Sequence, residues 1–485
     1  MASGHLTALT YAVRGRVIGK YLGQIGLVLA LLTLVPAAVA FASHDIQISR
    51  RCGEVILVLT FICLPLSRLR VVGHVQLNEA LVVSALTFVL SSLVMSWPFM
   101  SIGMSFLDAW FEAVSGVTTT GLSTLATVAD KPQAFLFARA WMQWYGGLGI
   151  AILWVALLFN HQFAMRRLVE GSGVESLVTT AQLHARRVLV VYSLLTLFGI
   201  LLLLLLQEGW FSAVTHILSA VSTGGFAIRD DSLARMGAAS YAVSAVSILG
   251  AISLPAYYLL YQRRWAKFLQ DVELRALLST GAAACLLLWL FLLRGGMGAG
   301  AGFGHAVALG ISAQTTTGFS TLSVAGLDAA AKLVLIIAML TGGCVGSTAG
   351  GVKMLRLLTV GVLFRQVMRR SALAPHAVAE PRLGGHTLEA DDIERALLIM
   401  ALYVGGMAFS WLPFLAAGYA PLDALFEVVS ATGTVGLSTG ITRTALEAPL
   451  KLVLIADMLF GRVEFIGLLV VLWPRTWFAK KDSGL

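Results

Sequence analysis

Long apolar runs alternate with short polar stretches along almost the whole chain, and most of the runs can cross a membrane as a helix, which takes about 20 predominantly apolar residues. The pattern predicts two helices followed by four pairs, over 22–42 and 54–70; 77–98 and 134–160; 186–207 and 237–262; 275–296 and 330–364; and 393–418 and 448–478. About 25 to 40 residues separate the two helices of each pair, too few for two further spans. Because non-helical backbone at membrane depth must be buried in protein or line water, we expect function to lie in these connectors.

The four connectors repeat one pattern. They align without gaps as FLDAWFEAVSGVTTTGLST (106–124), WFSAVTHILSAVSTGGFAI (210–228), FGHAVALGISAQTTTGFST (303–321) and PLDALFEVVSATGTVGLST (421–439). All four share a reference glycine, at Gly121, Gly225, Gly318 and Gly436, and threonine, serine and alanine recur two, six and twelve positions before it. Such agreement predicts a unit of helix, re-entrant segment and helix that is used four times.

The expected fold is an all-α multi-pass membrane protein, with four helix–pore-loop–helix repeats in pseudo-fourfold arrangement around one pore. Two N-terminal transmembrane helices are expected over 1–74. The four repeats are expected over 75–167, 168–267, 268–372 and 373–485.

The residues before each reference glycine indicate a site for a dehydrated monovalent cation. The carbonyl end of a helix carries about half a negative charge, and glycine lets successive carbonyl oxygens turn toward one axis. Rings of such oxygens replace the hydration shell of K⁺ in potassium channels, and uncharged oxygen ligands suit K⁺ better than a divalent ion. Packing of small residues between helices would explain one such copy, but not four in register. The residues expected to bind K⁺, here named the Thr-x-Gly segments, are Thr118, Thr119, Thr120 and Gly121; Ser222, Thr223, Gly224 and Gly225; Thr315, Thr316, Thr317 and Gly318; and Gly433, Thr434, Val435 and Gly436.

Composition and charge agree with a membrane protein. The chain is 58% hydrophobic and only 12% charged, which excludes an ordinary soluble enzyme, a disordered chain and a fibrous protein. The net charge of +9 reflects basic residues that fall on one side of the predicted membrane, and this bias marks the cytoplasmic loops and both termini. Arg50 and Arg51 are the exception, in the first outer loop. The four cysteines are widely spaced and are expected to be small buried hydrophobic residues.

A glycine-rich segment, GGCVGSTAGG over 342–351, interrupts the predicted helix over 330–364. Each glycine costs a helix about 1 kcal/mol relative to alanine, so we expect a broken helix there, with a loop that lines a cavity. Close packing of glycines between helices is the alternative.

At these residues the chain resembles the TrkH/TrkG–KtrB superfamily of potassium-translocating subunits. The resemblance rests on VTTTGLST (117–124), STGGFA (222–227), TTTGFST (315–321) and TVGLSTG (434–440), and also on RAWMQWYGGLGI (139–150), GGCVGSTAGGVK (342–353) and GRVE (461–464). The two additional N-terminal helices are more similar to TrkH or TrkG than to KtrB. The resemblance implies a homodimer in the bacterial inner membrane that takes up K⁺, with one pore per subunit. It also implies control by a cytoplasmic ring of nucleotide-binding, TrkA-like RCK proteins.

The resemblance further implies that the glycine-rich segment is an intramembrane gating loop. Its gating residues would be Gly342, Gly343, Gly346, Ser347, Thr348, Gly350, Gly351 and Lys353, together with Arg462. Arg462 would place a positive charge on the ion path, and a structural ion pair with Glu464 is the alternative. Glycine at all four reference positions indicates that K⁺ is preferred, but no aromatic–glycine pair follows it, so we expect weaker discrimination against Na⁺ than in tetrameric potassium channels.

Several alternatives remain open from the sequence. Asp108 and Asp423, at the start of the first and fourth connectors, could cap helices or attract cations to an outer vestibule. His216 and His305 are expected to pack rather than bind a metal, and Arg139 is also expected to be a packing residue. A symporter of K⁺ or Na⁺ with H⁺ is the second functional class, and a membrane enzyme or scaffold is the third. No nucleophile with a base, paired catalytic carboxylates, organic cofactor site or nucleic-acid site is expected.

Overall fold

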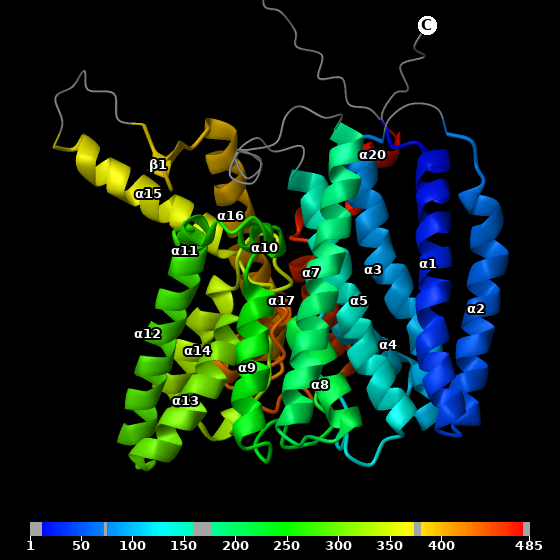
Figure 1. Cartoon of the computed structure of the whole chain (residues 1–485), viewed down its shortest axis with the longest axis horizontal. Coiled ribbons are helices and arrows are strands. Elements are labelled where there is room, and N and C mark those ends of the chain that lie inside the picture. The colour runs from blue at the N-terminus through cyan, green and yellow to red at the C-terminus, as the bar shows by residue number, and fades with distance from the viewer. Residues whose placement is uncertain (1–11, 72–74, 159–176, 373–379, 479–485) are drawn as a thin grey trace, which may run out of the picture.

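The computed structural model describes residues 12–71, 75–158, 177–372 and 380–478. In these residues nearly all regular structure is helical, and the long helices stand side by side in one bundle (Figure 1). The predicted all-α multi-pass membrane fold is confirmed. The two N-terminal helices, α1 (Gly15–Ala42) and α2 (Ile46–Ser67), pack along each other at one edge of the bundle.

Four groups of helices follow, each with a long helix, a short helix and a second helix. The groups are α3 (Leu77–Phe99), α4 (Phe106–Val117) and α5 (Gln133–Leu158); α7 (Leu177–Leu205), α8 (Trp210–Val221) and α9 (Ala238–Ala251); α12 (Val272–Arg294), α13 (Ala299–Gln314) and α14 (Ala329–Thr341); and α16 (Ala390–Ala416), α17 (Pro421–Thr432) and α18 (Ala448–Arg462). The short helices α4, α8, α13 and α17 occupy the predicted re-entrant connectors. Their C-terminal ends are buried inside the bundle.

The remaining elements connect or extend these groups. They are η1 (Met100–Ile102), η2 (Leu254–Ala256), α10 (Tyr257–Tyr261), α11 (Trp265–Leu269), η3 (Val324–Gly326), α15 (Met354–Arg370), the two-stranded hairpin of β1 (Arg382–Leu383) and β2 (His386–Thr387), α19 (Ile466–Leu472) and α20 (Pro474–Phe478). Helix α15 projects sideways from the bundle at the upper left of Figure 1.

Within the described residues, five helices are long and apolar enough to cross a membrane: α1, α3 with η1, α7, α12 and α16. A sixth span results if α9 and the short helices after it are taken together, although they bend by 89° at their break. The predicted break in the helix over 330–364 is present, since α14 ends at Thr341 and α15 begins at Met354.

Two other predicted helices are also interrupted, which the sequence prediction missed. The predicted helix over 237–262 breaks at Ile252 and Ser253, because Pro255 has no N–H to donate to the Ala251 carbonyl group and its ring would clash with that group in a continuous helix. The predicted helix over 448–478 breaks between α18 and α19, where Glu464 and Phe465 have positive φ angles of 53° and 61°.

The proposed boundaries between repeats stay predictions. The boundaries at 74/75, 167/168 and 372/373 include residues outside those described. Four residues of the predicted basic loops also lie outside them: Arg166, Arg167, Lys480 and Lys481. The boundary at 267/268 lies inside α11.

Candidate functional site

Each of the four short helices ends in the same backbone arrangement. At the end of α4, the N–H groups of Thr119 and Thr120 donate to the carbonyl oxygens of Gly116 and Ser115, at 3.0 and 2.9 Å. This is a Schellman motif, in which a residue with left-handed backbone follows the last turn and satisfies its free carbonyls. The same pair of bonds ends α8, α13 and α17. The left-handed residue is always the shared threonine: Thr119, Thr223, Thr316 and Thr434, with φ of 55°, 53°, 55° and 49°.

Glycine is the usual residue at this position of the motif, because left-handed backbone costs other residues about 1–2 kcal/mol. A β-branched threonine there is strained, and such strain persists only where the surroundings fix it. The arrangement therefore keeps four threonine hydroxyls at the ends of four helices at an energetic cost.

The four reference glycines close a ring. Each has positive φ, and a Cβ added to any of them would overlap a backbone carbonyl oxygen of the next repeat. The contacts run from Gly121 to Gly224, from Gly225 to Thr317, from Gly318 to Val435 and from Gly436 back to Thr120. Four segments that meet in this cyclic order surround one axis. The glycines thus provide both the backbone conformation and the close approach that the sequence led us to expect.

The serine six positions before the reference glycine supports the turn in two repeats. The hydroxyls of Ser115 and Ser430 accept hydrogen bonds from the N–H groups of Gly121 and Gly436, both at 3.0 Å. Gly433 is the fourth-repeat residue that lacks the side chain of its counterparts, and its carbonyl oxygen accepts the N–H of Gly351 at 3.0 Å.

A cavity of about 320 Å³ lies on the side of the ring formed by the reference glycines and the residues that follow them. It is lined by all four reference glycines and by residues that follow them, including Ser123, Ser320 and Ser438, and Asp230 also reaches it. One continuous opening therefore contacts all four Thr-x-Gly segments, which is the access an ion would need.

The glycine-rich segment lies against the other side of the ring. The N–H of Gly350 donates to the Thr316 hydroxyl at 2.7 Å, and the hydroxyls of Thr348 and Thr223 are 3.5 Å apart. In the part of the chain that the structure describes, the hydroxyls of Thr119 and Thr434 have no hydrogen-bond partner although they are buried. The segment also packs on Thr434, because a Cβ added to Gly350 would overlap the Thr434 hydroxyl oxygen. Three of the four shared threonines, Thr223, Thr316 and Thr434, therefore contact the segment.

The whole glycine-rich segment is buried, and residues of the second and third repeats satisfy its backbone. The N–H groups of Cys344 and Thr348 donate to the carbonyl oxygens of Ala251 and Gly250, at 3.0 and 3.2 Å. The amide of Gln314 donates to the carbonyl oxygen of Gly342 at 3.1 Å. Because unpaired buried backbone is costly, these bonds fix the segment in place. Gly343, Gly346 and Ser347 belong to the same buried stretch.

Arg462 holds the glycine-rich segment from the end of α18. Its guanidinium donates to the carbonyl oxygens of Thr348 at 2.9 Å and Gly146 at 3.1 Å. The alternative reading, an ion pair between Arg462 and Glu464, does not hold, because Glu464 pairs with Arg356 of α15 instead. Lys353 is buried with a positive φ of 76°, and its ammonium group donates to the Ala349 carbonyl oxygen.

Two buried carboxylates stand behind the Thr-x-Gly segments, and the sequence analysis did not single them out. Glu112 accepts the N–H of Thr124 at 3.0 Å and pairs with Arg139 at 3.0 Å. Glu427 is fully buried and accepts the N–H of Thr439 at 2.8 Å. Both lie nine positions before a reference glycine, but only the first and fourth repeats carry glutamate there, so the alignment of the four connectors gives no shared signal for them.

The expectation that Arg139 only packs is therefore incomplete. Its guanidinium lies 3.7 Å from the ring centroid of Phe226 and also pairs with Glu112. Phe226 follows the second reference glycine, and its N–H donates to the side chain of Gln143 at 3.1 Å. Helix α5 of the first repeat thereby braces the second Thr-x-Gly segment.

Asp108 and Asp423 join repeats to one another. Asp108 pairs with Lys451 at 2.6 Å, and Asp423 pairs with Lys332 at 2.7 Å. The hydroxyl of Ser105, rather than Asp108, caps α4. Both aspartates thus lie at interfaces between repeats.

Metal-binding side chains do not gather in the described residues: no group of three or more His, Cys, Asp or Glu could hold an ion there. His216 contacts Ser212, and His305 lies 3.0 Å from the Thr321 hydroxyl, so both pack as expected. The chemistry available at the ring is that of neutral oxygens. A family model described as a cation transport protein, that of TrkH, matches residues 75–476, which is most of the chain. The chain belongs to the TrkH family.

Several relatives of this TrkH-family chain match along most of their length. It is 28% identical over 425 residues to the Trk system potassium uptake protein TrkH of Escherichia coli, covering 84% of this chain and 87% of that protein. It is 27% identical over 402 residues to an uncharacterized cation transporter of Methanocaldococcus jannaschii, covering 82% and 83%. The crystal structure of the potassium transporter TrkH from Vibrio parahaemolyticus matches with a TM-score of 0.85 at 25% identity, covering 96% of this chain and 100% of that one. The predicted TrkH/TrkG resemblance is confirmed, and the family is one of transport proteins, not enzymes.

Proposed function

We propose that this TrkH-family chain is the ion-translocating subunit of a bacterial potassium uptake system. The observation that supports this most directly is the closed ring of four Thr-x-Gly segments, with each reference glycine against a carbonyl oxygen of the next repeat. In the proposal, carbonyl oxygens of these segments and the hydroxyls of the shared threonines replace the hydration shell of K⁺. The relatives named for potassium uptake support K⁺ as the ion.

The glycine-rich segment is proposed to be the gate. It lies directly beneath the ring, with Gly350 bonded to Thr316. An ion that leaves the ring on this side meets buried backbone, so conduction requires the segment to move. Arg462 opposes that movement through its bond to the Thr348 carbonyl oxygen, and its charge adds to the barrier.

Control is proposed to come from a cytoplasmic TrkA-like ring that binds nucleotide and docks on the basic loops. We further propose that the chain lies in the bacterial inner membrane as a homodimer, with both termini in the cytoplasm. Helix α15 supports this docking, since it follows the glycine-rich segment, projects from the bundle and ends in Arg369 and Arg370 (Figure 1). Docking through these charges predicts that the complex dissociates at high salt, and salt-insensitive binding would contradict it.

Tracer flux into liposomes tests the main proposal. Purified protein is reconstituted, and ⁸⁶Rb⁺ uptake is competed with external K⁺ or Na⁺. K⁺ is expected to compete better than Na⁺. Empty liposomes are the control for protein-dependent uptake, and a Gly318→Ala variant, which should discriminate less between the two ions, is the control for selectivity. Absence of protein-dependent uptake, or equal competition by choline, would overturn the proposal.

Symport with H⁺ is the second candidate, and the buried carboxylate of Glu427 favours it. In the described residues this carboxylate accepts hydrogen bonds only from hydroxyls and a backbone N–H, from Ser438, Thr439 and Thr442. A carboxylate without a cationic partner is suited to bind a proton. Uphill K⁺ uptake driven by a pH gradient, present in the unmodified protein and lost in Glu427→Gln, would support the symporter over the channel.

A further inference from the structure

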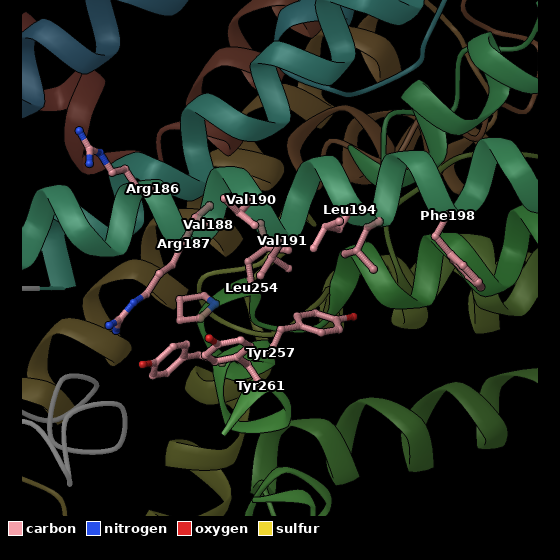
Figure 2. Close-up of a pocket in the computed structure, with 13 residues that line it drawn as sticks. Arg186, Arg187, Val188, Val190, Val191, Leu194, Phe198, Leu254, Tyr257 and Tyr261 are labelled. Atoms are coloured by element: carbon pink, nitrogen blue, oxygen red, sulfur yellow. The ribbon is translucent and has the colours of Figure 1, made fainter. Parts of the chain in front are cut away.

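A groove of about 750 Å³ opens on the outer surface of the bundle, away from the ring. One wall is α7, with Val190, Leu194 and Phe198, and the facing wall is the segment η2–α10. Figure 2 shows the α7 side chains in a row, with Tyr257 and Tyr261 opposite them. The 89° bend between α9 and the short helices after it turns η2–α10 aside, so that the groove stands open beside α7.

The wall of the groove on α7 is a lipid-facing surface. Val190, Leu194 and Phe198 are 56%, 59% and 53% exposed, although they belong to a helix long and apolar enough to cross the membrane. Exposed apolar side chains continue along the same helix at Leu201 and Leu205. In a bilayer such a surface is covered by acyl chains, so a chain can lie along α7 for most of its length.

One end of the groove is polar and positively charged. The guanidinium of Arg187 lies 3.9 Å from the ring centroid of Tyr258, and Tyr261 is also at this end. Figure 2 shows Arg187 turned toward the tyrosines. The adjacent Arg186 also lines the groove, but its guanidinium turns to the other side of α7. A planar guanidinium matches the oxygens of a phosphate, and tyrosine favours the interface between headgroups and acyl chains.

We propose that this groove binds an anionic phospholipid, with the phosphate at Arg187 and one acyl chain along Val190, Leu194 and Phe198. Two features favour this occupant. The positive charge of Arg187 complements a phosphate at one end, and the apolar wall continues into the lipid-facing side of α7 at the other. Basic pockets between transmembrane helices recognise lipid headgroups in this way. A helix of a partner protein would fill an apolar groove but would gain nothing from the guanidinium at its end unless it carried an acidic residue there.

Native mass spectrometry of the purified full-length protein tests the binding. Phosphatidylglycerol and phosphatidylcholine are titrated separately, and the fraction of protein that retains lipid is measured. The protein is expected to retain phosphatidylglycerol at lower concentration than phosphatidylcholine. Arg187→Gln should weaken phosphatidylglycerol binding about fivefold, the effect of one basic residue near a membrane surface.

Two further variants separate the site from general charge. Arg186→Gln removes the same charge from the adjacent position, where the guanidinium turns away from the tyrosines, and should change binding less than Arg187→Gln does. Leu194→Trp narrows the groove, keeps both arginines and should reduce binding of both lipids. Equal retention of the two lipids by the unmodified protein, or equal losses in Arg186→Gln and Arg187→Gln, would overturn the proposal. If a groove variant changed the oligomer mass but not the lipid retention, the groove would be a contact for a protein partner. That outcome would also overturn the proposal.

One residue that lines the groove also bonds to the glycine-rich segment, which extends the inference to the gate; this step rests on the proposed function. The N–H of Leu254, a groove residue, donates to the carbonyl oxygen of Gly346 at 3.1 Å. A lipid that braces η2 therefore stabilises the segment where it lies. Basal ⁸⁶Rb⁺ flux should be lower with phosphatidylglycerol than in phosphatidylcholine alone, and Arg187→Gln should lose that difference while Arg186→Gln keeps it. No flux in either lipid would overturn the proposed function but not the measured binding, whereas the same lipid effect in Arg187→Gln would overturn the link to the gate.

Discussion

At the scale of single residues, the site depends on backbone that most side chains disfavour. The shared threonines adopt left-handed conformation, and the reference glycines have φ between 74° and 97° beside a neighbouring carbonyl. The two residue types solve different problems. The shared threonines have strained backbone but place a hydroxyl at the helix end. The reference positions require glycine because nothing larger fits between adjacent segments.

Gly318→Ala should therefore damage ion selectivity. The new Cβ overlaps the Val435 carbonyl oxygen, which must move away from the axis. If this costs the bound K⁺ about 1.4 kcal/mol, the preference for K⁺ over Na⁺ falls about tenfold, measured by competition of ⁸⁶Rb⁺ flux.

Gly440→Ala is the matched control for that change. Gly440 has a similar φ of 91°, but a Cβ there meets nothing within 4 Å. It should share the backbone strain and keep the ion preference. Equal selectivity in the two variants would show that the carbonyl contact at Gly318 does not set it.

The hydroxyl of Thr316 has a second role, because it accepts the N–H of Gly350. Thr316→Val keeps the shape of the side chain and removes this bond, which contributes about 1 kcal/mol and corresponds to about fivefold in a closed-to-open ratio. Basal flux should rise by about that factor. Thr434→Val is the control, since the Thr434 hydroxyl has no hydrogen-bond partner within the described residues. A comparable rise in Thr434→Val would mean that the bond to Gly350 does not hold the segment.

At the scale of elements, the three interrupted second helices differ in how well the sequence predicts their breaks. The break after α14 follows from its glycines, and Pro255 is a signal for the break after α9. The break between α18 and α19 has neither glycine nor proline at residues 463–465. Its cause is tertiary: Phe465 packs on Tyr403 with ring centroids 4.9 Å apart, and Glu464 pairs with Arg356. Tyr403 lies in α16 and Arg356 in α15, both far from this break in the sequence, so these contacts leave no local pattern.

The same limit applies to the buried carboxylates. The alignment of the connectors finds the shared threonines and glycines because they are identical in four copies. The position nine before the glycine holds Glu112, His216, Leu309 and Glu427, so no shared chemistry marks it. The side chains at this position also have different partners: Glu112 pairs with Arg139, whereas His216 contacts Ser212.

Arg462 of α18 bonds to both α5 and the glycine-rich segment, and its replacement should release this proposed gate. Arg462→Ala removes the bonds to Thr348 and Gly146, each a buried bond to a charged donor worth about 1.5–3 kcal/mol. Basal ⁸⁶Rb⁺ flux should rise about tenfold or more. Unchanged or reduced flux in a folded variant would count against a gating role.

Arg462→Lys separates charge from attachment. Lysine keeps a positive charge but cannot place two donors in the geometry of the guanidinium. If the charge on the ion path is the barrier, Arg462→Lys should retain low flux. If attachment of the segment is the barrier, its flux should approach that of Arg462→Ala.

At the scale of the whole molecule, the ring depends on the contacts that join the first repeat to the fourth. Consecutive repeats are held together by the chain itself, but the first and fourth repeats are joined by contacts alone. These contacts include the packing of Gly436 on Thr120, the bond from Arg462 to Gly146, and the pair between Lys451 and Asp108, whose side chains are 6% and 13% exposed. The pair between Lys332 and Asp423 instead joins two consecutive repeats, and Asp423 is 32% exposed.

Asp108→Asn should accordingly disturb the ring more than Asp423→Asn. Removal of one partner leaves the ammonium group of Lys451 partly buried and uncompensated, which costs about 1–3 kcal/mol for a pair that is not fully enclosed. We expect Asp108→Asn to lower the unfolding temperature in detergent and to reduce the preference for K⁺ over Na⁺. Asp423→Asn should produce a smaller effect on both, because the chain still holds the third and fourth repeats together. If the two variants lost selectivity equally, closure between the first and fourth repeats would not be the step that shapes the ring, and the four Thr-x-Gly segments would be positioned by their own helices alone.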